Sequence, residues 1–231
     1  MKTKLTTLLA LVAGFFANNT ASAQDLTVTF DATVASKYVF RGVQLGDLTI
    51  HPSVQLEMDD YYISVWAALP QENRGSPDFF DDEIDIVFGR GMALNDSTAL
   101  DFGLTVYTYP NAENTAEAFL GVTHEMENGF SVGLTGFRDF DLDTFTVEAS
   151  GGYSVYLSDI ASLDIGGYIG TVQDDDAGDP DYTYYGVDLV VPIQLNDNTV
   201  LSLGAHYADH DDSSLGEDSH FFGTASVTYG F

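Results

Sequence analysis

Carboxylates that alternate with apolar residues are the side chains of this sequence best placed to do chemistry. Asp31 follows Phe30, for example, and Asp101 precedes Phe102. Residues that alternate along an extended segment point to opposite faces, so these carboxylates share a face that excludes the apolar side chains. Such a row attracts cations and repels anions where it lines water. The predicted lining set includes Asp31, Glu83, Asp85, Asp101, Glu148, Asp164 and Asp188.

Two basic residues, Lys37 and Arg41, stand four apart on the same face as Asp31 in the first extended segment. Their charges can pair with Asp31, with Glu57 or with acids near the last strand, which would fix the register of the strands. They can instead form the basic half of a constriction opposite the carboxylates. The pairing role is the favoured interpretation.

Nucleophile chemistry has little support in the sequence. His206 and His220 fall near Ser202 and Ser219, but there is no G-x-S-x-G elbow and no H-E-x-x-H pair. The absence of cysteine excludes disulfides, thiolate metal sites and cysteine nucleophiles. We therefore predict no catalytic residue, no metal site and no cofactor.

Two segments, 174–181 and 209–218, are very acidic. Carboxylates at this density could bind Ca²⁺ or Mg²⁺ and bridge to lipopolysaccharide phosphates. The first segment does not match an EF-hand, because Tyr185 occupies the twelfth position, where that motif has Glu. Solvated loops are the favoured interpretation of both segments.

The elements that must position the carboxylates are strands. Apolar and polar residues alternate over twelve segments, most of them with the nine or more residues that a tilted membrane strand needs. Short connections alternate with longer ones, which is typical of a transmembrane antiparallel β-barrel. The sequence therefore predicts an all-β fold of about twelve strands, with ten and fourteen as alternatives. The predicted strands cover 26–42, 50–58, 61–69, 82–92, 98–109, 116–126, 130–140, 144–157, 161–172, 181–195, 198–209 and 219–231.

Aromatic residues cluster near the ends of these strands, as they do in the interfacial girdles of membrane barrels. The clusters are Tyr38 with Phe40, Tyr61 with Tyr62, Tyr107 with Tyr109, Tyr182 with Tyr184 and Tyr185, and Tyr229 with Phe231. The ordinary preference of aromatic residues for strands is the alternative explanation.

The last strand carries a second membrane signal. Phe231 is the final residue and Tyr229 stands two before it, an ending that resembles the C-terminal signature of bacterial outer-membrane proteins. The resemblance implies that the barrel-insertion machinery recognises this end.

The N-terminus predicts export. Lys2 and Lys4 precede an apolar run, and Ala21-Ser22-Ala23 fits the A-x-A cleavage rule. We expect a signal peptide over residues 1–23, cleaved after Ala23, and one barrel domain over residues 24–231. The destination is the outer membrane of a Gram-negative bacterium.

The charge of the chain excludes one class of partner. Its formal net charge is −29 at pH 7, and loss of the two leader lysines makes it more negative still. Such a chain repels nucleic acid. A halophilic or marine habitat is a second possible cause of this acidity. A content of 45% hydrophobic residues and the periodic pattern exclude intrinsic disorder.

One local motif is specific. The residues Ser36, Tyr38, Val39, Phe40, Arg41 and Gly42 match an S-x-Y-V-F-R-G pattern. This stretch resembles the start of the mature chain in the TorF family of porin-like outer-membrane barrels of Gram-negative bacteria. Lys37 stands where that family commonly has an acidic residue. The resemblance implies a porin and no particular solute.

Together these features predict a narrow outer-membrane channel for passive diffusion of small hydrophilic solutes or cations. Outer-membrane lipid and lipopolysaccharide would surround the barrel. Small interior residues such as Gly152, Gly166 and Gly170 favour an open lumen, whereas carboxylates bound to Tyr and Ser hydroxyls would favour a closed one. A non-conducting structural or adhesive barrel is the first alternative, and a lipid hydrolase at the barrel rim is the less favoured second.

Overall fold

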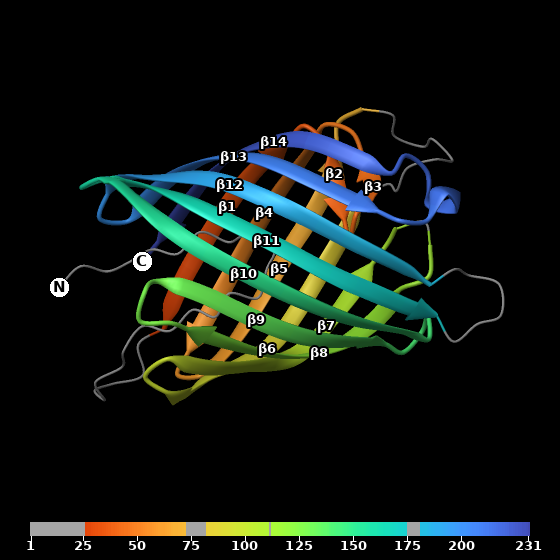
Figure 1. Cartoon of the computed structure of the whole chain (residues 1–231), viewed down its shortest axis with the longest axis horizontal. Coiled ribbons are helices and arrows are strands. Elements are labelled where there is room, and N and C mark those ends of the chain that lie inside the picture. The colour runs from red at the N-terminus through yellow and green to blue at the C-terminus, as the bar shows by residue number, and fades with distance from the viewer. Residues whose placement is uncertain (1–25, 73–81, 111, 175–180) are drawn as a thin grey trace.

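Twelve antiparallel strands close into a barrel in the part of the chain that the structure describes (Figure 1). The computed structural model describes residues 26–72, 82–110, 112–174 and 181–231, so the predicted signal peptide lies outside the described residues. The barrel closes where β1 pairs with β14, and each strand otherwise pairs with its neighbours along the chain. Its strands are β1 (Thr27–Ala35), β4 (Thr49–Met58), β5 (Tyr61–Pro70), β6 (Glu83–Asn95), β7 (Thr98–Thr108), β8 (Thr115–Glu125), β9 (Phe130–Asp139), β10 (Thr144–Ser158), β11 (Ala161–Asp174), β12 (Tyr182–Asn196), β13 (Thr199–His210) and β14 (Ser219–Gly230).

The predicted fold class and strand count are confirmed. Eleven predicted strands match β4 to β14 within three residues at either end. The only helix among the described residues is the 3₁₀ turn η1 (Ser213–Leu215). No described helix has the length and apolarity to cross a membrane.

The first predicted strand, 26–42, is wrong in its second half. β1 ends at Ala35, and the chain continues as a separate two-stranded hairpin of β2 (Tyr38–Phe40) and β3 (Val43–Gly46). The Ser36 hydroxyl accepts a hydrogen bond from the backbone N–H of Gly223 at 2.9 Å, and this side-chain bond follows the last β1–β14 pair. Arg41 and Gly42 both have positive φ, 47° and 82°, which is the backbone of a type I′ hairpin turn.

The two ends of the barrel differ in their connections. Short turns join β4 to β5, β6 to β7, β8 to β9, β10 to β11 and β12 to β13, and we call this the turn end. The longer connections, including the β2–β3 hairpin and the segment with η1, lie at the opposite loop end (Figure 1). β1 begins and β14 finishes at the turn end.

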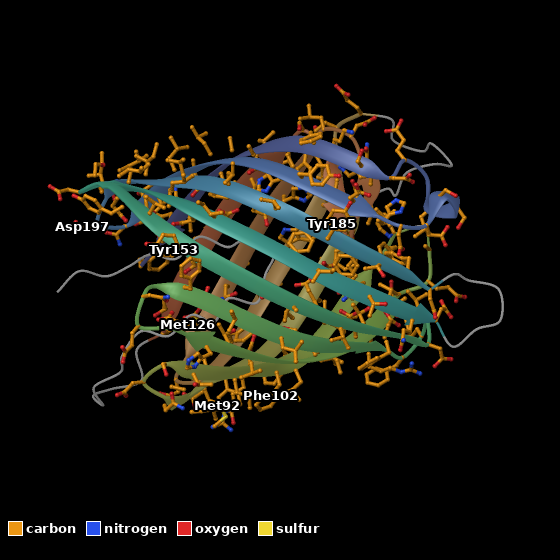
Figure 2. The ribbon with its side chains drawn as sticks, viewed as in Figure 1. Met92, Phe102, Met126, Tyr153, Tyr185 and Asp197 are labelled. Atoms are coloured by element: carbon orange, nitrogen blue, oxygen red, sulfur yellow. The ribbon has the colours of Figure 1, made fainter. Side chains whose placement is uncertain are left out.

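Inner and outer faces alternate along every strand, as the period of two requires. Large apolar side chains remain exposed on the outside, among them Phe30, Phe88 and Phe102, and Figure 2 shows Phe102 on this outer surface. An exposed apolar band is expected of a barrel that faces lipid.

The predicted aromatic clusters divide between the two faces. Tyr61 and Tyr229 are exposed on the outside, near the turn end. Tyr38 and Tyr184 instead donate hydrogen bonds to interior carboxylates. Only part of the aromatic set is therefore placed to form a girdle.

Candidate functional site

The β2–β3 hairpin lies inside the barrel at the loop end, and we call it the lumen hairpin (Tyr38–Gly46). Its residues contact β6 through Glu83, β8 through Glu117, β9 through Phe137 and β12 through Tyr184. These strands lie on widely separated parts of the wall. A single hairpin can reach all of them only by crossing the interior, so this element narrows the loop end of the lumen.

Arg41, at the tip of the lumen hairpin, is held by a two-point ion pair. Its guanidinium meets the two carboxylate oxygens of Glu117 at 3.0 and 2.8 Å. The Tyr107 hydroxyl donates a further hydrogen bond to Glu117 at 3.0 Å. The guanidinium carbon also lies 4.8 and 4.7 Å from the ring centres of Phe40 and Phe137. Paired charges and stacked rings are the contacts that a guanidinium makes best.

The electrostatics of this pair keep Arg41 charged. Burial by itself would lower the pKa of Arg41, but attraction to the Glu117 carboxylate outweighs it and raises the pKa above its usual value. The predicted pairing role of Arg41 is therefore present, but its partner is wrong. Neither Asp31 nor Glu57 receives it, because the chain turns inward after Ala35 and carries Arg41 across the lumen to β8.

Gly42 packs the other side of the hairpin tip against the wall. A Cβ at this position would lie 2.6 Å from the backbone oxygen of Asp209 and 3.0 Å from Cβ of Tyr184. No side chain fits there without moving the hairpin. The arginine and the glycine of the sequence motif thus fix the tip from opposite directions.

Tyr38 anchors the base of the lumen hairpin. Its hydroxyl donates to Glu83 at 2.8 Å, and its ring contacts His51 and Trp66, with centroid distances of 5.2 and 5.7 Å. His51 and Trp66 are themselves stacked at 4.8 Å. Val39 pairs with Gln44 across the hairpin, so the matched motif residues build one inward-folded element and its junction with β14.

The structure places the predicted strand carboxylates on the interior face of the barrel. In the strand register, each of them lies beside interior residues of the neighbouring strands. Most of them accept hydrogen bonds from hydroxyl groups. Asp31 accepts from Thr33 and Thr228, Glu83 from Tyr38, Asp101 from Tyr62, Glu148 from Tyr184, and Asp164 from Ser154 and Ser162. One oxygen of Asp85 is buried and makes no hydrogen bond to a described residue.

Hydroxyl donors solvate a carboxylate but do not cancel its charge. Glu117 faces Arg41, and Asp188 faces His206. The other predicted carboxylates of the strands have no ion pair with any residue that the structure describes. The interior of the barrel is therefore rich in carboxyl groups that have no basic partner among the described residues.

Asp188 and His206 belong to a hydrogen-bonded row across three strands. Asp188 contacts Nδ1 of His206 at 2.6 Å, and Nε2 of His206 contacts the Thr224 hydroxyl at 2.9 Å. The His206 ring also stacks on Phe222 at 4.8 Å. His206 does not meet Ser202 or Ser219, the serines considered for nucleophile chemistry, because the register opposes it to Asp188 and Phe222 instead.

Interior glycines do not all leave open space. A Cβ at Gly170 would lie 2.4 Å from the Tyr184 ring, and one at Gly89 would lie 2.2 Å from the Tyr62 ring. These aromatic rings cover glycines of the neighbouring strand, an arrangement that supports glycine in sheets. Gly166 has no such cover, since its nearest contact is Asp188 at 3.7 Å. The inference from small residues to an open lumen is therefore wrong at Gly170.

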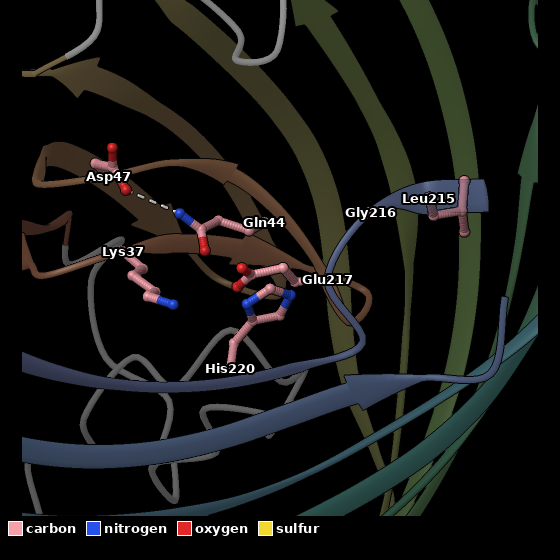
Figure 3. A pocket seen from close by; sticks show the side chains of 7 residues that line it. All are labelled: Lys37, Gln44, Asp47, Leu215, Gly216, Glu217 and His220. Carbon is pink, nitrogen blue, oxygen red and sulfur yellow. Dashed lines mark hydrogen bonds between the residues drawn. The ribbon is translucent and has the colours of Figure 1, made fainter. Parts of the chain in front are cut away.

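Lys37 lies apart from the barrel wall. It lines a cavity of about 470 Å³ with Gln44, Asp47, Leu215, Gly216, Glu217 and His220, between the lumen hairpin and the segment that contains η1 (Figure 3). Lys37 makes no ion pair with any residue that the structure describes, so its predicted pairing is wrong. It no longer lies on β1, from which that pairing was inferred.

The acidic loops have structural roles where they are described. Asp212 caps η1 by accepting from the backbone N–H of Ser214 at 2.7 Å, which lowers the pKa of its carboxyl. Asp211 accepts from the backbone N–H of Thr183 at 2.7 Å. Among the described residues no three His, Asp or Glu side chains form a metal-binding group. Most of segment 174–181 lies outside the described residues.

Comparison with solved structures identifies the class of fold. The KdgM porin in complex with disordered oligogalacturonate superposes with a TM-score of 0.61 at 9% identity, covering 89% of this chain and 99% of that one. The NanC porin gives 0.59 at 8% identity, covering 87% and 98%. The COG4313 outer membrane channel from Pseudomonas putida F1 gives 0.56 at 12% identity, covering 91% and 97%. The fold is that of an outer-membrane porin barrel.

The chain belongs to the Gcw_chp family. The family model described as "Bacterial protein of unknown function (Gcw_chp)" matches residues 18–218. No curated protein matches the chain.

The sequence did not single out Glu117, and its role as the partner of Arg41 was missed. The alternation at β8 was a sufficient signal for the face. No local signal could show that a residue 76 positions earlier returns through the lumen to meet it.

Proposed function

We propose that this protein is a narrow outer-membrane channel through which small hydrophilic solutes and cations diffuse passively. The observation that carries the proposal is the set of interior carboxylates, most of them without an ion pair to any described residue, in a closed barrel. A water-filled lumen lined by carboxylates concentrates cations and repels anions. The lumen hairpin would set the narrowest section, with Arg41 neutralised by Glu117.

Planar-bilayer recording tests this proposal. The chain from residue 24 to 231 is reconstituted under a tenfold KCl gradient, and the reversal potential is read. We expect stable conductance steps and a reversal potential displaced toward the K⁺ limit of about 59 mV. A folded, heat-modifiable barrel without conductance would reject the channel.

Neutralisation of the lining locates the source of selectivity. Asp101→Asn and Glu148→Gln each remove an interior carboxylate and should lower the cation preference while leaving the barrel conductive. Asp197→Asn removes an exposed carboxylate in the β12–β13 turn, outside the lumen (Figure 2), and should change selectivity least. Equal effects of all three substitutions would assign selectivity to the overall charge of the protein.

A second candidate function is a non-conducting structural or adhesive barrel, and the lumen hairpin favours it. The same contacts that narrow the loop end could close it, in which case bilayers would show no steps. A hydrolase at the rim is supported least, since His206 contacts Asp188 and Thr224 rather than the serines first considered.

The proposal extends to targeting. Residues 1–23 would be removed after Ala23, and the barrel-insertion machinery would recognise Tyr229 and Phe231. Lipopolysaccharide would face the loop end. A place in the TorF family remains a prediction from the Ser36–Gly42 motif. Mass spectrometry of the chain purified from outer membranes would test the cleavage site.

A further inference from the structure

The cavity beside Lys37 combines features that no structural role accounts for. Lys37 and Glu217 carry opposite charges, line the same cavity, and make no ion pair with any described residue. Figure 3 shows both side chains pointing into a shared space near His220. Because they remain apart, each charge is available to a ligand.

His220 gives an independent sign of a missing partner. The residue is 1% exposed, and neither ring nitrogen has a hydrogen-bond partner among the described residues. Buried polar atoms normally have a partner, and an exception calls for an explanation such as a ligand or water. Figure 3 shows this ring on the cavity side of β14.

Gln44 and Asp47 complete the polar side of the cavity. Gln44 donates its amide N–H to Asp47 at 3.0 Å, which leaves the carbonyl oxygen of Gln44 toward the space that Lys37 lines (Figure 3). Leu215 adds an apolar side chain from η1. The volume of about 470 Å³ is within the range of small-molecule sites.

We propose that this cavity binds a small zwitterionic solute with one carboxylate, one ammonium group and a short apolar side chain. The carboxylate would meet Lys37, the ammonium would meet Glu217, and His220 and Gln44 would complete their hydrogen bonding. Opposite charges that line one cavity favour a zwitterion over an ion of either sign, since a singly charged ligand would leave either Lys37 or Glu217 without a counter-charge. The amino acid leucine has the matching chemistry.

The site lies at the loop end, where a solute would enter the proposed channel. Binding itself does not depend on conduction, and only the onward passage of the solute rests on the proposed function. The two are tested apart. Conductance without leucine binding would reject the binding site but not the channel. Leucine binding without conductance would reject the channel but not the binding site.

Saturation-transfer NMR on the intact barrel in lipid nanodiscs is the test. The probes are L-leucine, 4-methylpentanoate, which lacks the ammonium, and 3-methylbutylamine, which lacks the carboxylate. We expect transfer to leucine and at least about tenfold weaker binding of either analogue, as the loss of one charge-assisted hydrogen bond predicts. Equal binding of the three compounds, or no transfer to leucine, would overturn the proposal.

Matched variants locate the site. Lys37→Gln and Glu217→Gln should each weaken leucine binding about tenfold or more. Arg138→Gln and Glu127→Gln remove the same charges outside the cavity, at an exposed loop-end pair and in the β8–β9 turn, and should leave binding unchanged. Leucine binding that survives both cavity substitutions would place the ligand elsewhere and reject this site.

Discussion

At the scale of single residues, the Arg41–Glu117 pair ties the lumen hairpin to the barrel wall. It is two-point, buried and reinforced by Tyr107. Glu117→Gln would leave the guanidinium buried without its counter-charge, and breaking such a pair usually costs about 3–5 kcal/mol. We expect a loss of this size in the free energy of unfolding, measured by urea titration of the barrel in lipid vesicles.

Two further variants make this prediction specific. Asp143→Asn removes the partner of Arg138 in an exposed pair, where the expected loss is about 0–1 kcal/mol. The double variant Arg41→Met with Glu117→Gln removes both charges and should lose less than the sum of its single variants. Additive losses would show that the two residues do not stabilise the barrel through each other.

Gly42 tests the packing of the hairpin tip. Gly42→Ala adds a Cβ that would meet the Asp209 backbone at 2.6 Å, in a left-handed conformation that costs a non-glycine residue about 1–2 kcal/mol. We expect lower stability and a larger single-channel conductance, because the tip must move away from β13.

Gly129→Ala is the control for Gly42→Ala. Gly129 has a similar φ of 86°, but its added Cβ would meet only the Tyr153 ring, at 3.5 Å or more. It should show the backbone cost without any change in conductance. A conductance change of the same size in both variants would show that the tip of the hairpin does not limit the pore.

At the scale of elements, the strands were predictable and the lumen hairpin was not. The period of two places Asp101 and Glu148 on one face whatever the rest of the chain does, and an error of a few residues at a strand end does not alter that face. Lys37 and Arg41 keep the parity of the polar face of the first strand, however. A strand that continues and a strand followed by a short hairpin therefore look alike in the sequence.

The turn itself gave a weak signal. Type I′ turns favour Asn-Gly and Asp-Gly, so Arg41-Gly42 did not mark one. The partners of the hairpin follow only from the closed barrel, because Glu83 and Glu117 come together with Tyr38 and Arg41 across the lumen. Site geometry of this kind depends on tertiary structure and cannot be obtained from local pattern.

The lumen hairpin can be removed without breaking the barrel ladder. Ala35 and Thr49 are direct partners in the β1–β4 register, so an Asn-Gly turn in place of residues 37–47 would join Ser36 to Leu48 in a two-residue hairpin. We expect a larger conductance with cation preference retained, since the strand carboxylates stay in place. An Asn-Gly turn in place of Asp159-Ile160, at the turn end, should leave conductance unchanged. A shortened barrel with wild-type conductance would mean that the constriction lies elsewhere.

At the scale of the whole molecule, closure of the barrel depends on the seam between β1 and β14. Phe231 exchanges both backbone hydrogen bonds with Val28 at 3.0 Å, and its ring stacks on Phe30 with a centroid distance of 6.2 Å. The same residue thus extends the closing ladder and carries the aromatic end that the insertion machinery is expected to recognise. These two roles can be separated, because the backbone bonds do not need the ring.

Phe231→Ala keeps the seam hydrogen bonds and removes the aromatic end. We expect the variant to fold into lipid vesicles in vitro but to assemble poorly in the outer membrane of cells, measured as the fraction of heat-modifiable barrel in each setting. Phe221→Ala removes a phenylalanine that is more exposed, 75% against 63%, from the other end of β14, and should assemble normally in cells. Equal failure of Phe231→Ala in vesicles and in cells would assign the terminal ring to seam closure, because vesicles contain no insertion machinery and only an intrinsic folding defect would appear there.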